Sequence, residues 1–453
     1  MTFHAFTQFG WPDGCNGLWR DRAIVPPREL PDLQWWIELA RIAERGRFDT
    51  LFFADAMGMG GFTPDDIENE ISSGRIILWD PAVAIPALAA ATEHLGFLFT
   101  SSIMQEPPFT FARRASTLDQ LTGGRVAWNI VTSYSPGAAR NFGLDDLPSR
   151  EERYAAADEY ASVAYQLWEG SWDDDAVVAD ASTGVYVDPA RVRPIHHAGE
   201  RYRVAGPHLT PPTPQRTPFI VQAGGSPTGR GFAARHAEMQ FLATGAPESM
   251  RSAIDDVRAR AVAAGRGADE IGFTISTGFI VGSTDEEARA LADAYDALDD
   301  FDDHAGYIAG SLGIDLSGLG PDDRVPSLDE PRSEGGMSGV LAAMRTRLGT
   351  GTPTLRELVG AYRDRNRVVG CPERIADAVE GWRELGFTGV ALALEPRPQS
   401  LVDFVDHVTP VLQRRGLAQR EYASGTLRNK IMGYGDRVPA SHPAARYRQE
   451  VSR

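Results

Sequence analysis

The chain contains little that would suit an oxidising compartment or a membrane. It has 453 residues but only two cysteines, Cys15 and Cys371, which are too few and too far apart for a disulfide framework or a zinc site. We expect both to be free thiols in a reducing compartment. The sequence has no signal peptide and no apolar run of about 18 residues or more, so we expect a cytoplasmic protein without a membrane segment.

Positive charge is also scarce. The formal net charge is −17, and Lys430 is the only lysine, so nearly all basic residues are arginines. Acidic and basic residues are spread along the chain, which argues against nucleic acid or an anionic membrane as a partner. A local basic pocket remains compatible with this charge, and arginine suits phosphate and carboxylate groups.

The motifs of several enzyme classes are missing. The chain has no GxSxG, Walker A, HExxH or CxxC motif, so hydrolysis by a nucleophilic serine, P-loop phosphoryl transfer and zinc chemistry have no support. His196 and His197 are the only adjacent histidines, and we interpret them as part of a surface loop. We therefore expect no metal site.

What is present is an alternation of short β-rich runs with longer segments of helical periodicity. Eight such pairs are expected for a TIM (β/α)8 barrel, and a doubly wound open sheet is the alternative. Polar or small residues gather just after the predicted strands, which favours the barrel because the strand ends share one mouth. The predicted strands are 3–9, 49–54, 96–101, 126–132, 219–222, 238–243, 272–281 and 389–395. The predicted helices are 33–45, 81–94, 108–121, 150–168, 228–236, 248–264, 285–298 and 372–385.

The chain is longer than the roughly 250 residues of a bare barrel. We assign the excess to insertions at the C-terminal mouth of a single domain covering residues 1–453, near residues 58–79, 171–215 and 301–353. Long loops of this kind usually shape a substrate cavity or a lid. The arginine-rich tail from Glu421 is expected to pack on a neighbouring subunit or to fray.

Two segments could together receive a phosphate group. In QAGGSPTGRGF a predicted strand runs into Gly225 and Ser226, with Pro227 at the first position of the next helix. Free backbone N–H groups at such a helix start attract anions, although an ordinary capped junction has the same pattern. The helix that begins at Arg150 adds a charge and the hydroxyl of Tyr154, although this pair also fits a surface network.

Two polar residues, one just after a predicted strand and one within another, are further candidates. Asp55 follows a strand of aliphatic and aromatic residues and could accept a hydrogen bond from a planar heterocycle or a ribityl hydroxyl, or cap a short helix. Asn129 lies within the apolar run VAWNIVTS. Its amide must therefore find a partner in the protein or in a ligand.

Together these segments resemble the bacterial luciferase-like flavin monooxygenases, and most closely the branch that contains nitrilotriacetate, EDTA and dibenzothiophene-sulfone monooxygenases. The resemblance covers almost the whole chain and includes ERGRFDTLFFAD, DPAVAIPALAAATEHLGFLFTSS, ARRASTLDQLTGGRVAWNIVTS, QAGGSPTGRGFAARHAE and VTPVLQRRGLAQREY. It implies a TIM barrel that binds reduced FMN non-covalently and uses O2. It also implies a separate NAD(P)H-dependent flavin reductase as partner, and a homodimer or homotetramer.

The resemblance also assigns roles to individual residues. The flavin contacts of the family correspond in this chain to Asp55, Thr100, Tyr154 and Ser226, of which the last two lie near the phosphate. Asn129 and Ser133 on the strand below the ring, and Gly225 in the phosphate loop, are further candidates. Arg150 stands where the sulfone branch has a histidine, and an arginine could replace it as a phosphate partner.

The substrate residues depart from the sulfone branch at one position. Ser311, in GSLGIDLSG, stands where that branch has a histidine, which disfavours a dibenzothiophene-type sulfone. The matching wall residues Phe6, Phe52 and Phe241 remain aromatic, although they also fit a plain core. We expect a small apolar or aromatic substrate, or one containing sulfur or nitrogen, rather than a polycarboxylate.

The resulting hypothesis is a two-component monooxygenase that uses reduced FMN and O2 to oxygenate a small organic molecule, often with C–S or C–N cleavage. Because the flavin would carry the redox chemistry, we assign no protein residue as catalytic. One alternative is a deazaflavin-dependent oxidoreductase of the same superfamily, which exchanges hydride with its substrate without O2. The other is a non-catalytic flavin-binding protein on the same fold.

Overall fold

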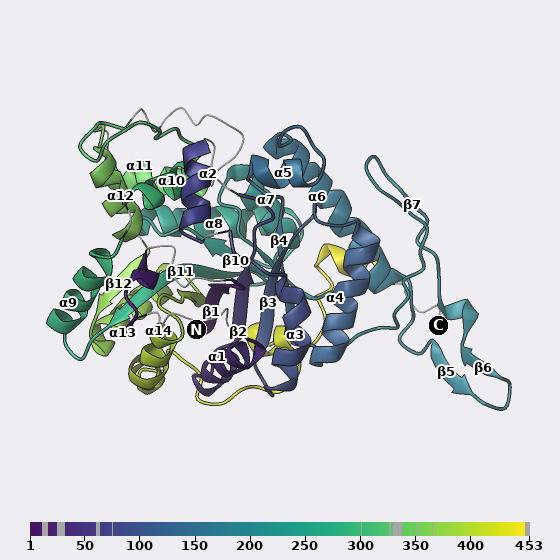
Figure 1. Cartoon of the computed structure of the whole chain (residues 1–453). Coiled ribbons are helices and arrows are strands. Elements are labelled where there is room, and N and C mark those ends of the chain that lie inside the picture. The colour runs from purple at the N-terminus through teal and green to yellow at the C-terminus, as the bar shows by residue number, and fades with distance from the viewer. Residues whose placement is uncertain are drawn as a thin grey trace.

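The chain folds around a closed barrel of eight parallel strands, seen in the computed structural model of Figure 1. The strands are β1 (Thr2–Gln8), β2 (Thr50–Ala54), β3 (Gly96–Ser102), β4 (Val126–Val131), β9 (Phe219–Gln222), β10 (Met239–Leu242), β11 (Gly272–Val281) and β13 (Gly389–Ala393). The barrel closes because β1 pairs with β13 and β10 pairs with β11. The TIM-barrel prediction is confirmed. The open sheet is excluded, because an open sheet has two unpaired edge strands and the pairing of β10 with β11 leaves none in this barrel. The structure describes residues 1–10, 17–24, 32–59, 64–74, 76–299, 301–325, 328, 338–349, 351–364 and 366–448.

All eight predicted helices are present on the outside of the barrel. They are α1 (Leu33–Arg45), α3 (Pro81–Ala90), α4 (Pro108–Thr122), α6 (Arg150–Tyr165), α7 (Pro227–His236), α8 (Pro247–Ala263), α9 (Asp285–Asp296) and α13 (Pro372–Leu385). Local chemistry sets where they begin. At the start of α6 the Ser149 side chain accepts from the Glu152 N–H, and the Glu152 carboxylate accepts from the Ser149 N–H in return.

Two of the insertions carry helices that cover the mouth of the barrel. The first contains α2 (Pro64–Ser72), and the third contains α10 (Phe301–Leu312) and α11 (Ser338–Leu348). Helix α10 packs against α2 and, with α12 (Leu355–Asp364), forms a second apolar cluster. The short helix α5 (Pro136–Asn141) and the strand β12 (Arg367–Gly370), which pairs with the far end of β11, were not predicted.

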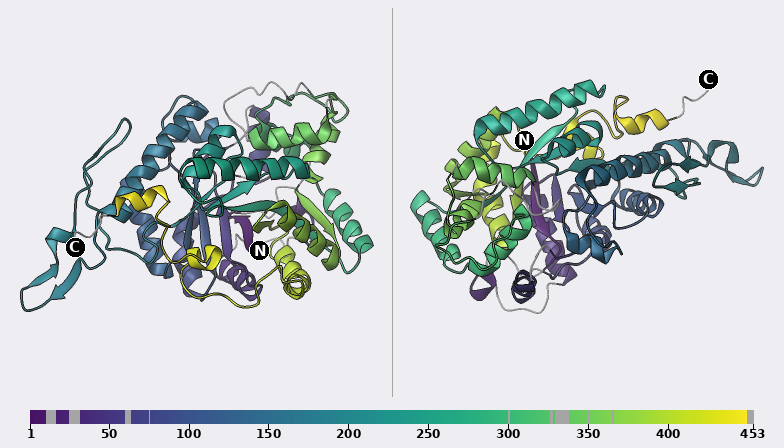
Figure 2. Two further views of the ribbon diagram at one scale, coloured as in Figure 1. Left: turned by 180° about the vertical axis from the view of Figure 1, so that it is seen from behind. Right: turned by 90° about the horizontal axis from the view of Figure 1, so that it is seen from above.

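The middle insertion does not lie at the mouth, and this part of the prediction is wrong. Residues 171–215 follow the C-terminal end of α6 and lead into β9, so they leave the barrel at its opposite end. They form two hairpins, β5 (Val177–Asp180) with β6 (Val185–Val187) and β7 (His197–Ala198) with β8 (Arg203–Val204). Figures 1 and 2 show these hairpins projecting from the side of the barrel.

The strands alternate inward and outward side chains as a closed barrel requires. On β2, Phe52 packs in the barrel interior while Phe53 packs against the helices. The interior also includes Leu427, from the short helix α16 (Leu427–Met432) near the C-terminus. Among the described residues, no helix is long and apolar enough to cross a membrane.

The described part of the tail after Glu421, up to residue 448, packs on the chain's own barrel, so the expectation that it frays is wrong for these residues. Contact with a neighbouring subunit stays a prediction. Arg428 on α16 is fully buried, and its guanidinium donates to both carboxylate oxygens of Glu238 at 2.6 and 2.9 Å. The same guanidinium donates to the backbone carbonyl of Thr217 at 2.8 Å. Glu238 also accepts from the Tyr434 hydroxyl at 2.7 Å, so the tail is fixed to the strand ends by a satisfied network.

Removing one partner of this buried ion pair should strongly destabilise the fold. Arg428→Ala leaves the Glu238 carboxylate buried without its counter-ion, and we expect a loss of about 3–5 kcal/mol in the free energy of unfolding by urea. Arg414 is the matched control, since its side chain is 63% exposed beside Glu373 and Arg414→Ala should cost at most about 1 kcal/mol. Equal effects of the two substitutions would contradict this role for Arg428.

Candidate active site

The predicted cofactor residues lie at the carboxyl ends of four neighbouring strands. Asp55 follows β2, and Thr100 lies on β3. Asn129 lies on β4, and Ser226 follows β9. The barrel order is β2, β3, β4 and β9, so three inter-strand steps of about 4.8 Å give an arc of about 14 Å along the rim.

The middle of this arc is a pair of buried polar side chains. Thr100 and Asn129 are register partners on adjacent strands, and the Asn129 amide donates to the Thr100 hydroxyl at 2.9 Å. The amide oxygen of Asn129 is buried and has no partner among the described residues. Ser133, just beyond β4, has a φ of 61° and a hydroxyl 2.9 Å from that of Ser102. The arc thus holds an unused acceptor beside a hydroxyl pair.

One end of the arc is the N-terminus of α7. Ser226 is the N-cap, and its hydroxyl oxygen accepts from the Gly229 N–H at 3.0 Å. The Tyr154 hydroxyl from α6 lies against the loop, since a Cβ on Gly224 would come within 2.4 Å of it. Gly225 links Gly224 to the N-cap, so backbone N–H groups, a serine and a tyrosine hydroxyl converge there.

The side chain of Tyr154 is held from both neighbouring elements. The Gln222 amide at the end of β9 donates to the Tyr154 hydroxyl at 3.2 Å. Burial raises the pKa of Tyr154, while the Gln222 bond and the charges of Arg153 and Arg150 oppose the rise. Arg150 begins α6 one helical turn before Tyr154, so both residues lie on the same helix face.

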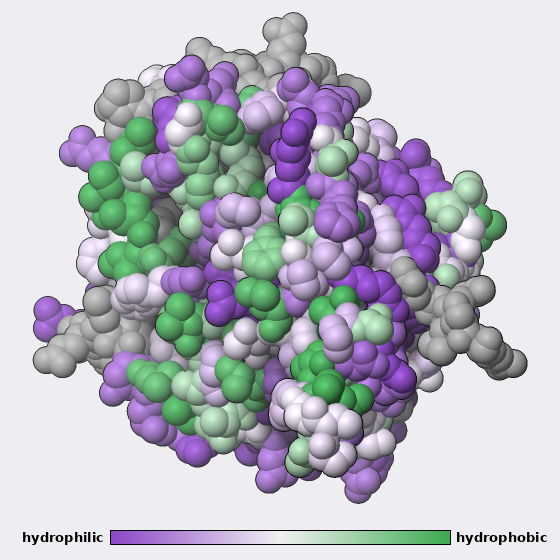
Figure 3. Space-filling model, turned by 90° about the vertical axis from the view of Figure 1, so that its right-hand side faces the viewer, coloured by the Kyte–Doolittle hydropathy of each residue, from purple (hydrophilic) through white to green (hydrophobic). Residues whose placement is uncertain are grey.

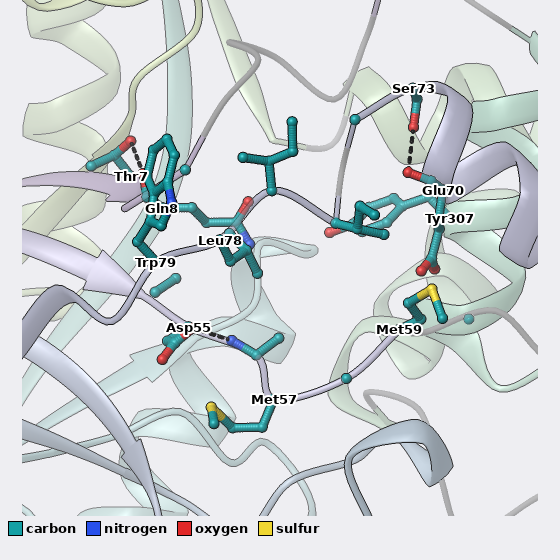
Figure 4. Close-up of a pocket in the computed structure, with 18 of the residues that line it drawn as sticks. Thr7, Gln8, Asp55, Met57, Met59, Glu70, Ser73, Leu78, Trp79 and Tyr307 are labelled. Carbon is teal, nitrogen blue, oxygen red and sulfur yellow. Dashed lines mark hydrogen bonds between the residues drawn. The ribbon is translucent and has the colours of Figure 1, made fainter. Parts of the chain in front are cut away.

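The other end of the arc opens into a cavity of about 690 Å³ under α2 and α10. Asp55 lines this cavity, and its carboxylate accepts from the Ala56 N–H at 2.9 Å. Burial raises the pKa of Asp55 to about 6, the nearby Asp80 adds to the rise and Arg114 opposes it. Figure 4 shows Asp55 on the wall of this cavity that lies across from Glu70 and Tyr307.

The predicted substrate residues are divided between the cavity and the layer beneath it. Phe6 and Ser311 line the cavity. The Phe52 ring lies deeper in the barrel interior, 4.9 Å from the Phe6 ring and stacked at 5.0 Å on Phe241. Phe6 is therefore the one of these three aromatic residues that faces the cavity.

Several cavity residues were not predicted from the sequence. Trp79, Glu70 and Tyr307 come from the insertions, and Tyr134 follows the predicted Ser133. Aromatic residues within mouth insertions would have been a usable signal, because such loops cover the site. Arg397, after β13, lines the same cavity.

Arg397 fixes the backbone beside the cavity. It donates to the Thr7 hydroxyl at 3.0 Å and to the carbonyl oxygens of Gln8 and Gly10 at 2.9 and 3.1 Å. Its guanidinium also lies over the ring of Trp36, 5.4 Å from the ring centroid. The end of β1 is thereby held in place.

The remaining candidates for metal chemistry are the histidine pair and the cysteines. The His197 side chain contacts polar side chains on α6 and at its C-cap. His197 lies 3.2 Å from the Glu159 carboxylate and 3.0 Å from the Gln166 amide, on the outer face of α6. Within the described ranges, no group of three or more His, Cys, Asp or Glu side chains could hold a metal ion. Cys371 is a free, half-buried thiol, and Cys15 lies outside the described residues.

The chain is similar in sequence and in structure to known monooxygenases and to a riboflavin lyase. Residues 15–389 match the luciferase-like monooxygenase family. The chain is 40% identical to a dimethyl-sulfide monooxygenase of Hyphomicrobium sulfonivorans, over 95% of this chain and 90% of that protein. It is 39% identical to a long-chain alkane monooxygenase of Geobacillus thermodenitrificans, over 96% and 94% of the two chains. A solved structure of riboflavin lyase with modified FMN and riboflavin matches with a TM-score of 0.88, 31% identity and 99% and 100% coverage.

The resemblance to the sulfone and nitrilotriacetate branch is confirmed. A dibenzothiophene-sulfone monooxygenase of Rhodococcus erythropolis is 34% identical, over 97% of both chains. A nitrilotriacetate monooxygenase component of Aminobacter aminovorans is 33% identical, over 92% and 93% of the two chains. The matches extend over nearly the whole chain, including the segments inserted into the barrel.

The raised pKa of Asp55 predicts a pH-dependent stability. The pKa of about 6 in the folded chain exceeds the unfolded value of about 3.9, so the stability that Asp55 contributes at low pH is lost as pH rises through about 6. As the pH rises from about 5 to 8, the unfolding free energy of wild type should therefore fall by about 1–2 kcal/mol relative to that of Asp55→Asn.

The control for this measurement is Asp180, whose pKa is lowered to about 2, chiefly by the Ser182 hydroxyl. Because Asp180 stays ionised over this range, Asp180→Asn should shift stability by nearly the same amount at both pH values. A difference between wild type and Asp55→Asn that does not change with pH would show that Asp55 does not titrate near 6.

Proposed function

The chain belongs to the luciferase-like monooxygenase family, and we propose that its rim binds reduced FMN along the arc from Asp55 to Ser226. Members of this family use reduced flavin and O2 to oxygenate organic compounds. The observation that carries the proposal is the arc itself. It joins an anion-binding helix start to a cavity through the buried amide oxygen of Asn129, which has no partner among the described residues. An extended molecule with a phosphate at one end and a polar ring at the other fits this order of groups.

The residues of the rim suit FMN at both of its ends. The α7 N-terminus, the Ser226 hydroxyl and the Tyr154 hydroxyl supply donors for a phosphate, and Arg150 would add a positive charge. We call the Gly224–Ser226 loop, the α7 N-terminus and the Tyr154 hydroxyl the phosphate cradle. Gly224 supports this fit, because a side chain there would collide with the Tyr154 hydroxyl and fill the cradle. The unpartnered amide oxygen of Asn129 suits a ring N–H, which would satisfy that buried acceptor.

In the proposed reaction, the cofactor would supply the electrons and the protein would orient the ring, exchange a proton and exclude water. When bound, reduced FMN supplies two electrons to O2, so that one oxygen atom enters the substrate and the other leaves as water. The chain itself orients the ring through Asn129 and Thr100, and the carboxyl of Asp55 takes up or releases a proton near pH 6 at the cavity wall. Helices α2 and α10 cover the cavity and exclude water from the reacting groups.

A separate reductase is the proposed source of reduced FMN. The family includes proteins named as one component of a pair, such as the nitrilotriacetate monooxygenase component. We propose that an NAD(P)H-dependent flavin reductase delivers reduced FMN to this chain. The non-covalent contacts of the cradle are compatible with such exchange, because they consist of hydrogen bonds and a helix terminus.

The cavity favours a neutral, largely apolar substrate. Among the described residues that line it, four carboxylates stand against one arginine, which disfavours a polycarboxylate. Phe6, Trp79 and Tyr307 supply apolar and aromatic surface, and the volume of about 690 Å³ is in the usual range for small-molecule sites. Two relatives named for dimethyl sulfide and long-chain alkanes support a thioether or a hydrocarbon skeleton.

Self-association is also proposed. The β5–β6 hairpin exposes Val177, Val178, Val185 and Tyr186, the last with 71% of its surface accessible. On the side of the molecule shown in Figure 3, apolar side chains form separate patches between hydrophilic ones. A homodimer or homotetramer that buried such patches would remove apolar surface from water.

A direct assay separates the proposal from its alternatives. Reduced FMN, O2 and a set of thioethers and alkanes should give substrate-dependent oxygen consumption, with one atom from 18O2 in the product. Turnover that proceeds without O2 would favour the deazaflavin-dependent alternative. Tight flavin retention without product under any reductant would favour a flavin-binding protein.

The phosphate cradle gives a second prediction. Tyr154→Phe and Ser226→Ala should each weaken anaerobic binding of reduced FMN about 10- to 100-fold, since each removes a hydrogen bond to a charged phosphate. Reduced riboflavin lacks the phosphate, so its dissociation constant should change by less than about threefold in both variants.

The control is Thr426→Ala, which removes an N-cap of similar chemistry from α16 at the far end of the barrel. It should lower stability without changing FMN affinity. If the two cradle variants weakened FMN and riboflavin equally, the phosphate would not lie at Tyr154 and Ser226.

A further inference from the structure

Beyond the main cavity lies a second, smaller one that we call the inner compartment. It has a volume of about 230 Å³ and lies between the far half of β11 and the ends of α9, α10 and α12. Phe6, Tyr307, Ala393 and Glu395 line both cavities, so the inner compartment continues the main cavity past this boundary. A substrate held at the rim could extend one end into it.

The inner compartment contains an oriented histidine. The Nδ1 atom of His304 lies 2.9 Å from a carboxylate oxygen of Asp299, and both side chains are at least nine-tenths buried. Because a carboxylate only accepts, Nδ1 carries a hydrogen, and in the Nδ1–H tautomer the lone pair of the ring lies on Nε2. Nε2 has no hydrogen-bond partner among the described residues, and His304 lines the compartment, so Nε2 is the acceptor that this side chain has available there.

A donor faces the same compartment. The amide oxygen of Asn366 accepts from the Thr244 hydroxyl at 2.9 Å, which fixes the orientation of the amide. The Asn366 amide nitrogen has no hydrogen-bond partner in the described part of the chain, and Asn366 lines the compartment. The compartment therefore offers one acceptor and one donor from elements far apart in the sequence.

The charges on the compartment wall are already paired. Arg367 donates to both carboxylate oxygens of Asp296 at 2.7 and 2.8 Å. Arg363 lies 3.5 Å from Asp296 and 3.9 Å from Asp299. Among the described lining residues, the carboxylates of Asp296, Asp299 and Glu395 stand against the guanidinium groups of Arg363 and Arg367, so this part of the lining disfavours an anionic group.

We propose that the inner compartment binds a hydroxyl group of the substrate, which donates to His304 and accepts from Asn366. A hydroxyl is the small neutral group that does both. The inference rests on the proposed function and names its substrate class, which is an alcohol whose apolar or sulfur-containing part lies in the main cavity. His304 and Asn366 are then specificity residues, and Asp299 is a positioning residue that holds the ring of His304.

Matched probes test this assignment. Each pair consists of an n-alkyl methyl sulfide and the thioether of equal length in which the terminal CH3 is replaced by OH, over a short series of chain lengths. Binding is measured by titration calorimetry, without flavin and with reduced FMN under nitrogen, so that no turnover occurs. At the optimal length the hydroxyl probe should bind wild type at least about tenfold more tightly than its alkyl partner.

Two variants connect the preference to the proposed residues. His304→Phe and Asn366→Ala should each reduce the ratio of the two dissociation constants to within about threefold. Thr277→Val, in the wall of the same compartment, is nearly isosteric and should retain the wild-type ratio. If His304→Phe does not fold, Asn366→Ala decides the test.

Three results would overturn the inference: equal affinities of the two probes for wild type, binding of neither probe, or a preference that persists in the variants. The oxygen assay with the same probes keeps the two proposals apart. A hydroxyl preference without oxygen consumption would contradict the proposed function and leave the inner compartment as assigned. Oxygen-dependent turnover with equal probe affinities would contradict the inner compartment alone.

Discussion

Closure of the barrel is the constraint on which the remaining structure depends. The pairings of β1 with β13 and of β10 with β11 leave no free edge, so all eight strands point their carboxyl ends at one rim. Neighbouring strands lie about 4.8 Å apart, and this spacing brings side chains from distant parts of the sequence into one arc. Asp55, Asn129 and Ser226 lie along one arc of the rim because β2, β3, β4 and β9 are consecutive in the barrel.

The polar groups at the two ends of the barrel differ in how they are paired. At the end opposite the mouth, α16 inserts Leu427 into the barrel interior, and Arg428 neutralises the buried Glu238. At the mouth, the buried amide oxygen of Asn129 has no partner among the residues that the structure describes, and burial raises the pKa of the Asp55 carboxyl. A paired charge that fixes the scaffold at one end and polar groups available to a ligand at the other are what a barrel that binds a polar cofactor requires.

The sequence predicted the barrel well because buried parallel strands are short apolar runs and amphipathic helices follow them. It also located the polar rim, since Asp55 and Ser226 stand directly after such runs. It failed for β12, whose four residues pair only with the projecting end of β11. The prediction for the tail failed because arginine-rich segments are usually exposed to solvent. Arg428 is buried instead, because its charge is paired with the carboxylate of Glu238, 190 residues away in the sequence. The cavity residues Trp79 and Tyr307 depend on how the insertions fold back over the mouth, which local patterns do not reveal.

We propose that FMN lies along the rim with its phosphate at α7 and its ring towards the cavity. A crystal structure of the chain with bound FMN would show whether it does. Phosphate oxygens should lie within hydrogen-bonding distance of the Tyr154 and Ser226 hydroxyls, and the edge of the ring should reach the amide of Asn129. FMN bound with its phosphate elsewhere, or with its ring outside the barrel mouth, would contradict the proposal.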